Sequence, residues 1–352
     1  MTRVRAICAA TCLVVVTVAT AAEPGPLTWR AVWEWSMPKR TDQDLVKLVE
    51  RAHALGFNAL LMSPPSGKAQ FLADQCHQRG VQLYVSTVFS GGDSAWQQAM
   101  TPAQERRATQ PFGETYQEGG EPVSPDELMT SPQPCWARPE VREFFAAKVR
   151  ELAALPVDGL AFDYIGYRNY ERCYCPVCER SLVGYQQAHP GLALAVATDR
   201  WAEQVLVDFT NEMAAVARAA RPDIKLTIHV YPVFRPNPCY GYRLNLDYVG
   251  ETVSWFFRPH WPLAKVQDRI ADVVGHQATR FPGEKAAPFV AFNAQQARDY
   301  RSARRVRTEL EMVKHSGASA LQMAELGYLL AKPLVAQAVA ETLGGSYRAP
   351  DL

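Results

Sequence analysis

Two neighbouring groups of side chains in residues 157–178 have types and spacing that suit chemistry. The first is the acid Asp163, followed by Tyr164, at the end of a short apolar run. A carboxylate at the carboxyl end of a buried strand is where α/β barrels place reactive groups. The second group is a C-x-C-x2-C cluster made of Cys173, Cys175 and Cys178. Thiols at this density are typical of a metal site or a disulfide framework.

Two further acids stand near the ends of predicted strands. Glu325 ends the predicted strand 318–325, and Glu34 lies in a Trp-Glu-Trp segment of the predicted strand 28–37. Cleavage of a glycosidic bond needs one carboxyl group as acid and a second as base or nucleophile. We therefore predict catalytic roles for Asp163, Glu325 and Glu34, although Glu34 could instead face outward from the sheet.

Aromatic and polar side chains lie near the same predicted strand ends. Aromatic faces suit sugar rings, but filling of the core or rim explains large aromatics equally well. As substrate-binding candidates we assign Trp33, Tyr164, Arg168, His229, Tyr231, Trp255 and Asn293. The pair Asn211-Glu212 is excluded as a catalytic pair, because it lies within the helical pattern 205–219.

Alternating strand-like and helix-like segments must position these residues. Eight apolar runs are predicted as strands: 28–37, 58–62, 81–89, 157–164, 224–231, 248–257, 287–293 and 318–325. Continuous apolar runs are typical of strands that are buried on both faces. Eight strand–helix units predict a single α/β domain over residues 23–352, a (β/α)8 TIM barrel. An open doubly wound sheet would need a Gly-rich phosphate turn, which the sequence lacks.

One predicted connection is much longer than the others. Residues 90–139, after the third predicted strand, are rich in Gly, Pro and Glu, and residues 102–109 within them have a helical pattern. Long loops in compact domains are usually functional. We expect this loop to shape the cleft.

The N-terminus has the pattern of a secretory signal peptide. Arg3 and Arg5 precede an apolar run, and residues 19–21 form a small-residue cleavage pattern. The run is too short to span a bilayer comfortably. We expect residues 1–22 to be removed and the chain to be exported, to the periplasm or outside the cell, with no membrane attachment afterwards.

Charge and composition narrow the choice of partners. The formal net charge is +1, and no basic stripe with interleaved aromatics argues for nucleic acid. Apolar residues make up 48% of the chain and charged residues 21%, as in an ordinary globular protein. We expect a carbohydrate as the partner, and the sequence predicts no particular oligomeric state.

The path from Cys135 through the fourth predicted strand to the segment CYCPVC resembles glycoside hydrolase family 42, the β-galactosidase barrels. The resemblance covers residues 132–185. In that family a cysteine before the third helix joins a C-x-C-x2-C cluster in a structural zinc site. The resemblance thus implies zinc bound by Cys135, Cys173, Cys175 and Cys178. Four thiolates would leave no open position for a catalytic metal.

The chain departs from that family at the catalytic positions. The family has Asn-Glu at the end of strand four, where this sequence has Asp163 between Phe and Tyr, and a nucleophilic Glu on strand seven, where residues 293–295 are Asn-Ala-Gln. The segment 158–168, DGLAFDYIGYR, is more similar to glycosyl-hydrolase-like barrels with a strand-four DGxxxDY element. There the Asp is taken as the catalytic or sugar-binding acid.

Alternatives exist for both the function and the cysteines. The missing strand-seven acid favours, as a second hypothesis, a non-catalytic carbohydrate-binding barrel. A metal-dependent hydrolase of another bond is disfavoured, because no His-x-His or His/Asp cluster lies at a strand end. Export favours disulfides, which would need distant partners such as Cys135 and Cys239. Structural zinc, disulfides and free thiols are therefore three alternatives.

Overall fold

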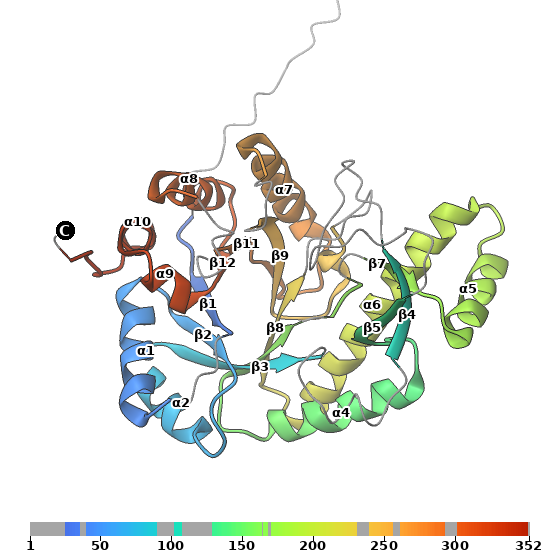
Figure 1. The fold of residues 1–352 in the computed structure, drawn as a ribbon, viewed down its shortest axis with the longest axis horizontal. Helices are drawn as coiled ribbons and strands as arrows, with labels where there is room; N and C mark the ends of the chain where they lie inside the picture. Colours follow the sequence, from blue (N-terminus) through green and yellow to red (C-terminus); the bar gives the residue numbers. More distant parts are fainter. Residues whose placement is uncertain are drawn as a thin grey trace, which may run out of the picture.

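The computed structural model describes residues 25–35, 40–89, 102–107, 129–163, 165–167, 170–230, 239–255, 261–292 and 301–350. In these ranges parallel strands form a closed barrel surrounded by helices (Figure 1). The predicted (β/α)8 barrel is thus confirmed. The expected signal peptide, residues 1–22, lies outside the described residues. In the part of the chain that the structure describes, we find no helix with the length and apolarity to cross a membrane.

Eight strand positions make up the barrel wall, and the seventh is divided into two short strands. They are β1 (Trp29–Glu34), β2 (Ala59–Met62), β3 (Gln82–Val88), β6 (Gly159–Asp163), β8 (Lys225–Val230), β9 (Tyr248–Ser254), β10 with β11 (Lys285–Ala286 and Phe289–Ala291) and β12 (Ala320–Ala324). Every pairing is parallel, β12 pairs with β1, and pairing of β8 with β9 closes the ring.

Helices follow the strands and cover the outside of the barrel. They are α1 (Asp42–Ala54), α2 (Ala69–His77), α4 (Pro139–Ala153), α5 (Pro176–Ala188), α6 (Leu194–Ala220), α7 (Leu263–Gly275), α8 (Ala303–Lys314), α9 (Leu326–Leu330) and α10 (Pro333–Leu343). Local signals set their ends. A capping box at Thr41 starts α1, and Gly344, with φ of 78°, ends α10. Two short 3₁₀ helices, η1 (Gly241–Arg243) and η2 (His276–Thr279), lie in connections.

The barrel interior is a packed core with a polar network in its middle. Side chains alternate along each strand, so that Trp29, Ala31 and Trp33 of β1 face inward. The Trp33 indole N–H donates to Gln322 Oε1 at 2.8 Å, and the Gln322 amide donates to Thr227 Oγ1 at 2.7 Å. These bonds satisfy the buried polar groups and tie three strands together.

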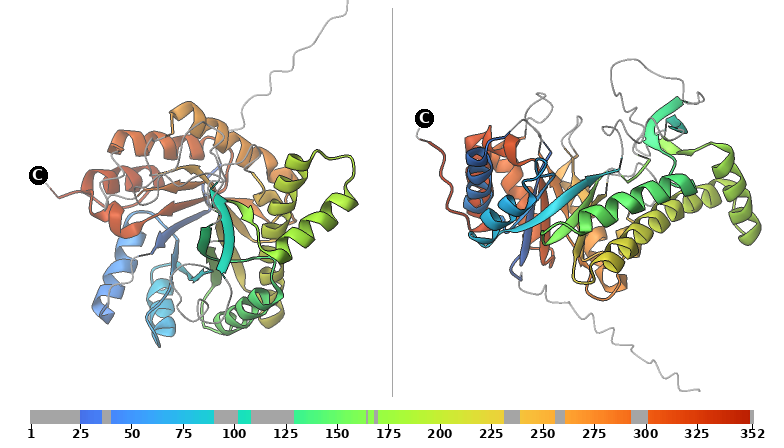
Figure 2. Two further views of the ribbon diagram at one scale, coloured as in Figure 1. Left: turned by 45° about the vertical axis from the view of Figure 1, so that its right-hand side comes forward. Right: turned by 90° about the horizontal axis from the view of Figure 1, so that it is seen from below.

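A second, small sheet lies outside the barrel. Strands β4 (Pro102–Arg107), β5 (Met129–Pro134) and β7 (Tyr170–Cys173) pair antiparallel in the order β5-β4-β7. Figure 2 shows this sheet beside the helices α4 and α5. The predicted helical pattern over 102–109 is therefore wrong for Pro102–Arg107, because backbone pairing with two other strands holds that segment extended.

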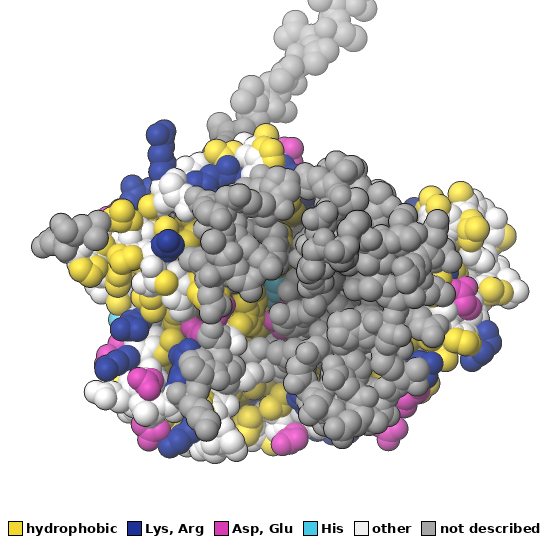
Figure 3. Space-filling model, viewed as in Figure 1, with side chains coloured by type: hydrophobic (Ala, Val, Ile, Leu, Met, Phe, Trp, Pro, Cys, Tyr) yellow, Lys and Arg dark blue, Asp and Glu magenta, His cyan; other side chains and the backbone are white. Residues whose placement is uncertain are grey.

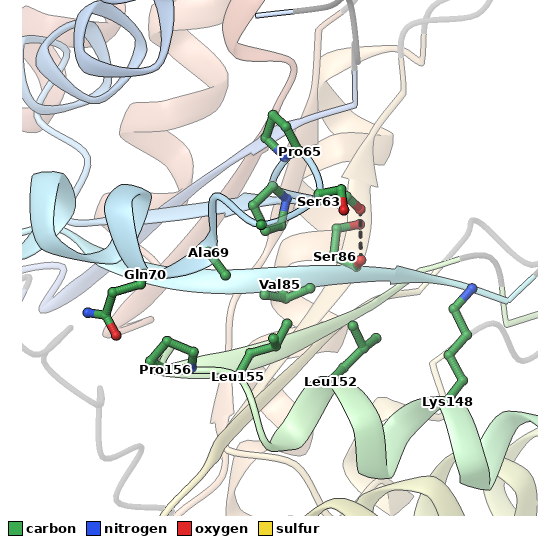
Figure 4. A pocket seen from close by; sticks show the side chains of 13 residues that line it. Ser63, Pro65, Ala69, Gln70, Val85, Ser86, Lys148, Leu152, Leu155 and Pro156 are labelled. Atoms are coloured by element: carbon green, nitrogen blue, oxygen red, sulfur yellow. Dashed lines mark hydrogen bonds between the residues drawn. The ribbon is translucent and has the colours of Figure 1, made fainter. Parts of the chain in front are cut away.

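A cavity of about 500 Å³ lies on the outside of the barrel, between α2 and α4. Figure 4 shows Leu152 of α4 and Leu155, just after that helix, directed toward Val85 of β3. Val85 belongs to the cluster that faces the helices, so the cavity is separate from the barrel interior. A hydrogen bond from Ser63 Oγ to the carbonyl of Ser86, 2.9 Å long, lies in its lining.

A substitution at Gly250, in β9, tests how tightly the barrel interior is packed. A Cβ added at Gly250 would lie 2.4 Å from the Gln322 side chain, a distance that real structures avoid. We expect Gly250→Ala to lower the free energy of unfolding by about 1–3 kcal/mol through overpacking, measured by urea denaturation. Gly184→Ala is the control, since that site in α5 has no atom within 4 Å and should not be destabilised. Equal stability of the two variants would contradict this packing.

Candidate functional site

Asp163 and His229 form a buried pair at the carboxyl ends of adjacent strands. The register pairs Phe162 of β6 with Ile228 of β8, so the next residue of each strand turns inward at the same level. The distance from Asp163 Oδ1 to His229 Nδ1 is 3.1 Å, and both side chains are 0% exposed. A buried acid needs such a partner, since an uncompensated charge in the interior is costly.

Aromatic rings surround His229. Its imidazole stacks on Phe289 of β11 with the ring centres 3.9 Å apart. Trp35 and Trp255 lie at 5.8 and 6.1 Å from the same ring. The second imidazole nitrogen, Nε2, lies 3.2 Å from Thr252 Oγ1 of β9. The mouth of the barrel is thus lined by aromatic rings around one acid–base pair.

Trp35 was missed as a candidate, although it follows the Trp-Glu pair at the end of β1. Its indole nitrogen is buried, and it has no hydrogen-bond partner among the described residues. A buried donor without a partner is uncommon in native proteins. Its position beside His229 makes this N–H available to an oxygen of a bound ligand. The signal in the sequence was period-two alternation, which puts Trp35 on the same face as Trp33.

Glu325 lies across the barrel from Asp163. It directly follows β12, which is four strand positions from β6 in either direction around the ring. The backbone N–H of Glu325 donates to the carbonyl of Phe292 at 2.9 Å, and the residue is 3% exposed. Asp163 and Glu325 are therefore carboxyl groups on opposite sides of one barrel mouth.

Glu34 lies on the helix-facing side of β1, the outward orientation that the sequence left open. Its carboxylate accepts hydrogen bonds from the backbone N–H of Gly327, at 3.0 Å, and from Arg40, at 2.9 Å. Burial raises the pKa of Glu34 to about 7, because the lowering by Arg40 does not offset desolvation and Glu325 adds to the rise. Glu34 thus lies near Glu325 and contacts the backbone of α9, the helix that follows Glu325.

The remaining predicted binding residues fall into two groups. Trp33 is 0% exposed inside the barrel, and its ring lies below the mouth, 6.3 Å from that of His229. Trp255 is 5% exposed beside His229. Four others lie outside the described residues: Tyr164, Arg168, Tyr231 and Asn293. The excluded pair Asn211-Glu212 is in α6, as predicted.

Figure 3 gives the surface view of the face seen in Figure 1. Near its centre, acidic and histidine atoms lie together with hydrophobic ones.

A buried ion-pair network supports the end of β9 from outside the barrel. Glu309 of α8 accepts hydrogen bonds from Ser254, Arg301 and Arg305 at 2.8, 2.7 and 2.6 Å. It therefore fixes the end of β9 against α8, a contact between distant segments that no local pattern predicts.

Four cysteines meet in one buried cluster. The sulfur atoms of Cys135, Cys173, Cys175 and Cys178 all lie within 4.8 Å of one another, and none of them is in a disulfide. Cys135 Sγ is 3.7 Å from Cys175 Sγ and 3.3 Å from Cys178 Sγ. The cluster joins the end of β5, the end of β7 and the first turn of α5.

The donor set of this cluster suits a thiophilic cation. Hydrogen bonds from neighbouring thiols, followed by burial, raise the pKa of Cys178 well above its usual range. A cation that binds the Cys178 thiolate would offset this rise. Cys239, one of the two distant partners considered for a disulfide framework, lies elsewhere, with its sulfur 3.2 Å from Arg269 Nη1. This arrangement can hold one tetrahedral metal ion.

Trp136 connects the cysteine cluster to the loop that follows Asp163. It is the neighbour of Cys135 and is fully buried. Its indole N–H donates to the carbonyl of Gly166 at 3.3 Å, three residues beyond Asp163. The ring also packs against Phe209 of α6, with the centres 4.9 Å apart. Trp136 thus links the cysteine cluster to the segment that follows Asp163 in the chain.

Comparison with known proteins places the fold. No protein-family model matches the chain, and no curated protein matches it. The glycoside hydrolase domain of PgaB (BpsB) from Bordetella bronchiseptica is 14% identical, covering 92% of this chain and 99% of that domain with a TM-score of 0.57. The β-galactosidase from the psychrophilic Marinomonas ef1 is 12% identical, covering 90% of this chain and 59% of its own, with a TM-score of 0.62.

A family 42 enzyme is also similar. The GH42 β-galactosidase Gan42B from G. stearothermophilus is 12% identical, covering 93% of this chain and 57% of its own, with a TM-score of 0.59. The chain thus spans less than two thirds of either β-galactosidase. The likeness confirms the predicted resemblance at the level of the fold, a barrel of the glycoside-hydrolase type.

The raised pKa of Glu34 predicts a change of stability with pH. A carboxyl whose pKa is raised by folding, here from 4.5 to about 7, stabilises the fold below pH 4.5, and this stabilisation is lost as the pH rises through 7. Relative to Glu34→Gln, the free energy of unfolding of the natural chain should fall by up to about 3 kcal/mol across this window. Denaturant titrations at several pH values measure it.

Glu284→Gln is the matched comparison. Burial also raises the pKa of Glu284 to about 7, but its carboxylate binds the backbone of Leu246 and Phe281, away from the mouth. The effects of the two substitutions on the free energy of unfolding should be additive, because the two sites are apart. A natural chain and a Glu34→Gln variant with parallel stability curves between pH 4.5 and 7 would contradict the assignment.

Proposed function

We propose that the protein is an exported glycoside hydrolase that cleaves a glycosidic bond in a carbohydrate. The observation that carries the proposal is the placement of Asp163, paired with His229, across the barrel mouth from Glu325. Two carboxyl groups on opposite sides of a mouth suit attack on a bond held between them. The likeness of the fold to glycoside hydrolase domains and the signal-peptide pattern support it.

The roles follow from the surroundings of each acid. Asp163 is the nucleophile or base, because its hydrogen bond to His229 orients the carboxyl group at the barrel mouth. Glu325 is the general acid that protonates the leaving oxygen. Glu34 assists Glu325 by position, since its carboxylate accepts a hydrogen bond from the backbone N–H of Gly327, two residues beyond Glu325.

Aromatic side chains at the mouth bind the sugar. Trp255 and Trp35 present rings beside His229, and the Trp35 indole N–H donates to a sugar hydroxyl. Tyr164, Arg168, Tyr231 and Asn293 follow strands of the wall in the sequence, and we propose that they complete the binding site. A ring face and a polar edge together match the two faces of a pyranose.

The four cysteines would bind a structural zinc ion. In a tetrahedral site with zinc–sulfur distances of about 2.3 Å, sulfur atoms lie about 3.8 Å apart. The distances in the cluster, 3.3 and 3.7 Å from Cys135 to Cys178 and Cys175 and at most 4.8 Å overall, lie around this value. The residues therefore fit the group. Zinc would hold the thiolates together and pin the loop after β6 through Trp136, which keeps Asp163 in position.

Substitution of Asp163 tests the reaction. Asp163→Asn should reduce turnover by about a hundredfold or more, because the amide cannot act as nucleophile or base. The measurement is the release of new reducing ends from a panel of oligosaccharides. Asp158→Asn is the control. Asp158 stands at the other end of the same strand, where it accepts from the backbone N–H of Leu83, and its substitution should leave turnover intact.

Two results would argue against the reaction. Unchanged turnover in Asp163→Asn would remove this acid from the mechanism. Binding of an oligosaccharide without any cleavage by the natural chain would favour the alternative, a carbohydrate-binding barrel. The absence of an acid at residues 293–295 is consistent with that alternative.

Elemental analysis tests the metal. The mature natural chain should contain one zinc ion, and Cys175→Ser should lose it together with several kcal/mol of stability. Cys76→Ala is the control, because Cys76 is equally buried but lies outside the cluster. Disulfides among the four cysteines in the purified protein, with no metal, would contradict this part of the proposal.

A further inference from the structure

Both ring nitrogens of His229 are engaged by protein groups. Nδ1 lies 3.1 Å from Asp163 Oδ1, and Nε2 lies 3.2 Å from Thr252 Oγ1. Phe289 covers one face of the ring. The side chain is 0% exposed. These contacts do not suit a histidine that binds a sugar, which was its predicted role.

The hydrogen bonds of Thr252 determine where one proton lies. Its hydroxyl donates to the carbonyl of Val230 at 2.9 Å, and a hydroxyl has a single proton to donate. A carbonyl can only accept. Toward the imidazole the Thr252 oxygen must therefore act as the acceptor. It follows that Nε2 of His229 carries a proton.

The proton on Nε2 constrains the contact with Asp163. If Asp163 is ionised, it can only accept, so Nδ1 must also carry a proton and the pair is an ion pair. If Nδ1 is unprotonated, the carboxyl must be protonated and donate to it. In both cases one proton lies between Nδ1 and Oδ1, and the pair is neutral overall.

We propose that His229 is a positioning residue for Asp163, oriented by Thr252, rather than a ligand of the sugar. The arrangement engages Oδ1 of Asp163 and holds it toward β8. It also fixes the carboxylate plane, because Oδ1 is held from β8 while the backbone is held in β6. This inference rests on the proposed function for its catalytic meaning, but the proton arrangement stands without it.

The proton arrangement is measured without a substrate. In the mature full-length chain labelled with ¹⁵N-histidine, NMR reports the protonation of each ring nitrogen at neutral pH, and loss of signals in His229→Asn assigns them. Nε2 should carry a proton. Thr252→Val, which removes the acceptor but keeps the shape, should change the His229 signals, whereas Thr252→Ser should preserve them. An unprotonated Nε2 in the natural chain would overturn the proposal.

A second pair of variants separates positioning from packing. The amide nitrogen of Asn can take the place of Nδ1, and that of Gln the place of Nε2. His229→Asn should therefore keep the bond to Asp163, and His229→Gln should lose it. On an oligosaccharide that the natural chain cleaves, His229→Gln should lower kcat at least about tenfold more than His229→Asn, with KM little changed.

The outcomes of the two experiments are distinguishable. Equal losses of kcat in His229→Asn and His229→Gln would show that His229 only fills space and would overturn the positioning role. A mainly raised KM in both would return His229 to sugar binding. If the natural chain cleaves no oligosaccharide, the proposed function fails, while the NMR result still decides the proton arrangement.

Discussion

The closed parallel barrel allows each strand residue only two directions, inward or toward the helices, and the site depends on this constraint. Asp163 and His229 are 66 residues apart in sequence, yet the register of β6 and β8 brings their side chains into hydrogen-bond contact. The layers beneath them are filled by Trp29, Trp33, Tyr84, Gln322 and smaller residues, which leave no space for the pair deeper in the barrel. Packing below and strand register at the side thus fix the geometry at the mouth.

A second support acts from outside the wall. The chain leaves β6, crosses to β7 and enters α5 through three of the four clustered cysteines. Cys135 and Trp136 reach the same place from β5, and the Trp136 indole bonds back to Gly166. Residues that contact the reacting groups keep an accurate geometry only when the residues around them hold them in place. Here that shell is the small sheet and the thiol cluster, which hold the loop immediately after Asp163.

The sequence predicted what depends on local periodicity and short spacing. Buried runs identified the wall strands, and the position of Asp163 followed from the end of one run. The spacing of the cysteines identified three members of the cluster, and the resemblance to family 42 supplied the fourth, Cys135. Contacts between distant segments were not predictable. The extended form of Pro102–Arg107 depends on pairing with β5 and β7, and the role of Thr252 depends on its bond to Val230. The orientation of Glu34 depended on which alternate residues of β1 face inward, and a Trp-Glu-Trp pattern does not decide this.

The central claim is that a sugar ring binds at the barrel mouth against Asp163. A crystal structure of the Asp163→Asn protein, soaked with an oligosaccharide that the natural chain cleaves, tests it most directly. The account predicts a sugar ring between residues 163 and 325, in contact with Trp35 or Trp255 and without a direct bond to the His229 ring. An oligosaccharide bound elsewhere, for example in the cavity between α2 and α4, with none at the mouth, would contradict it.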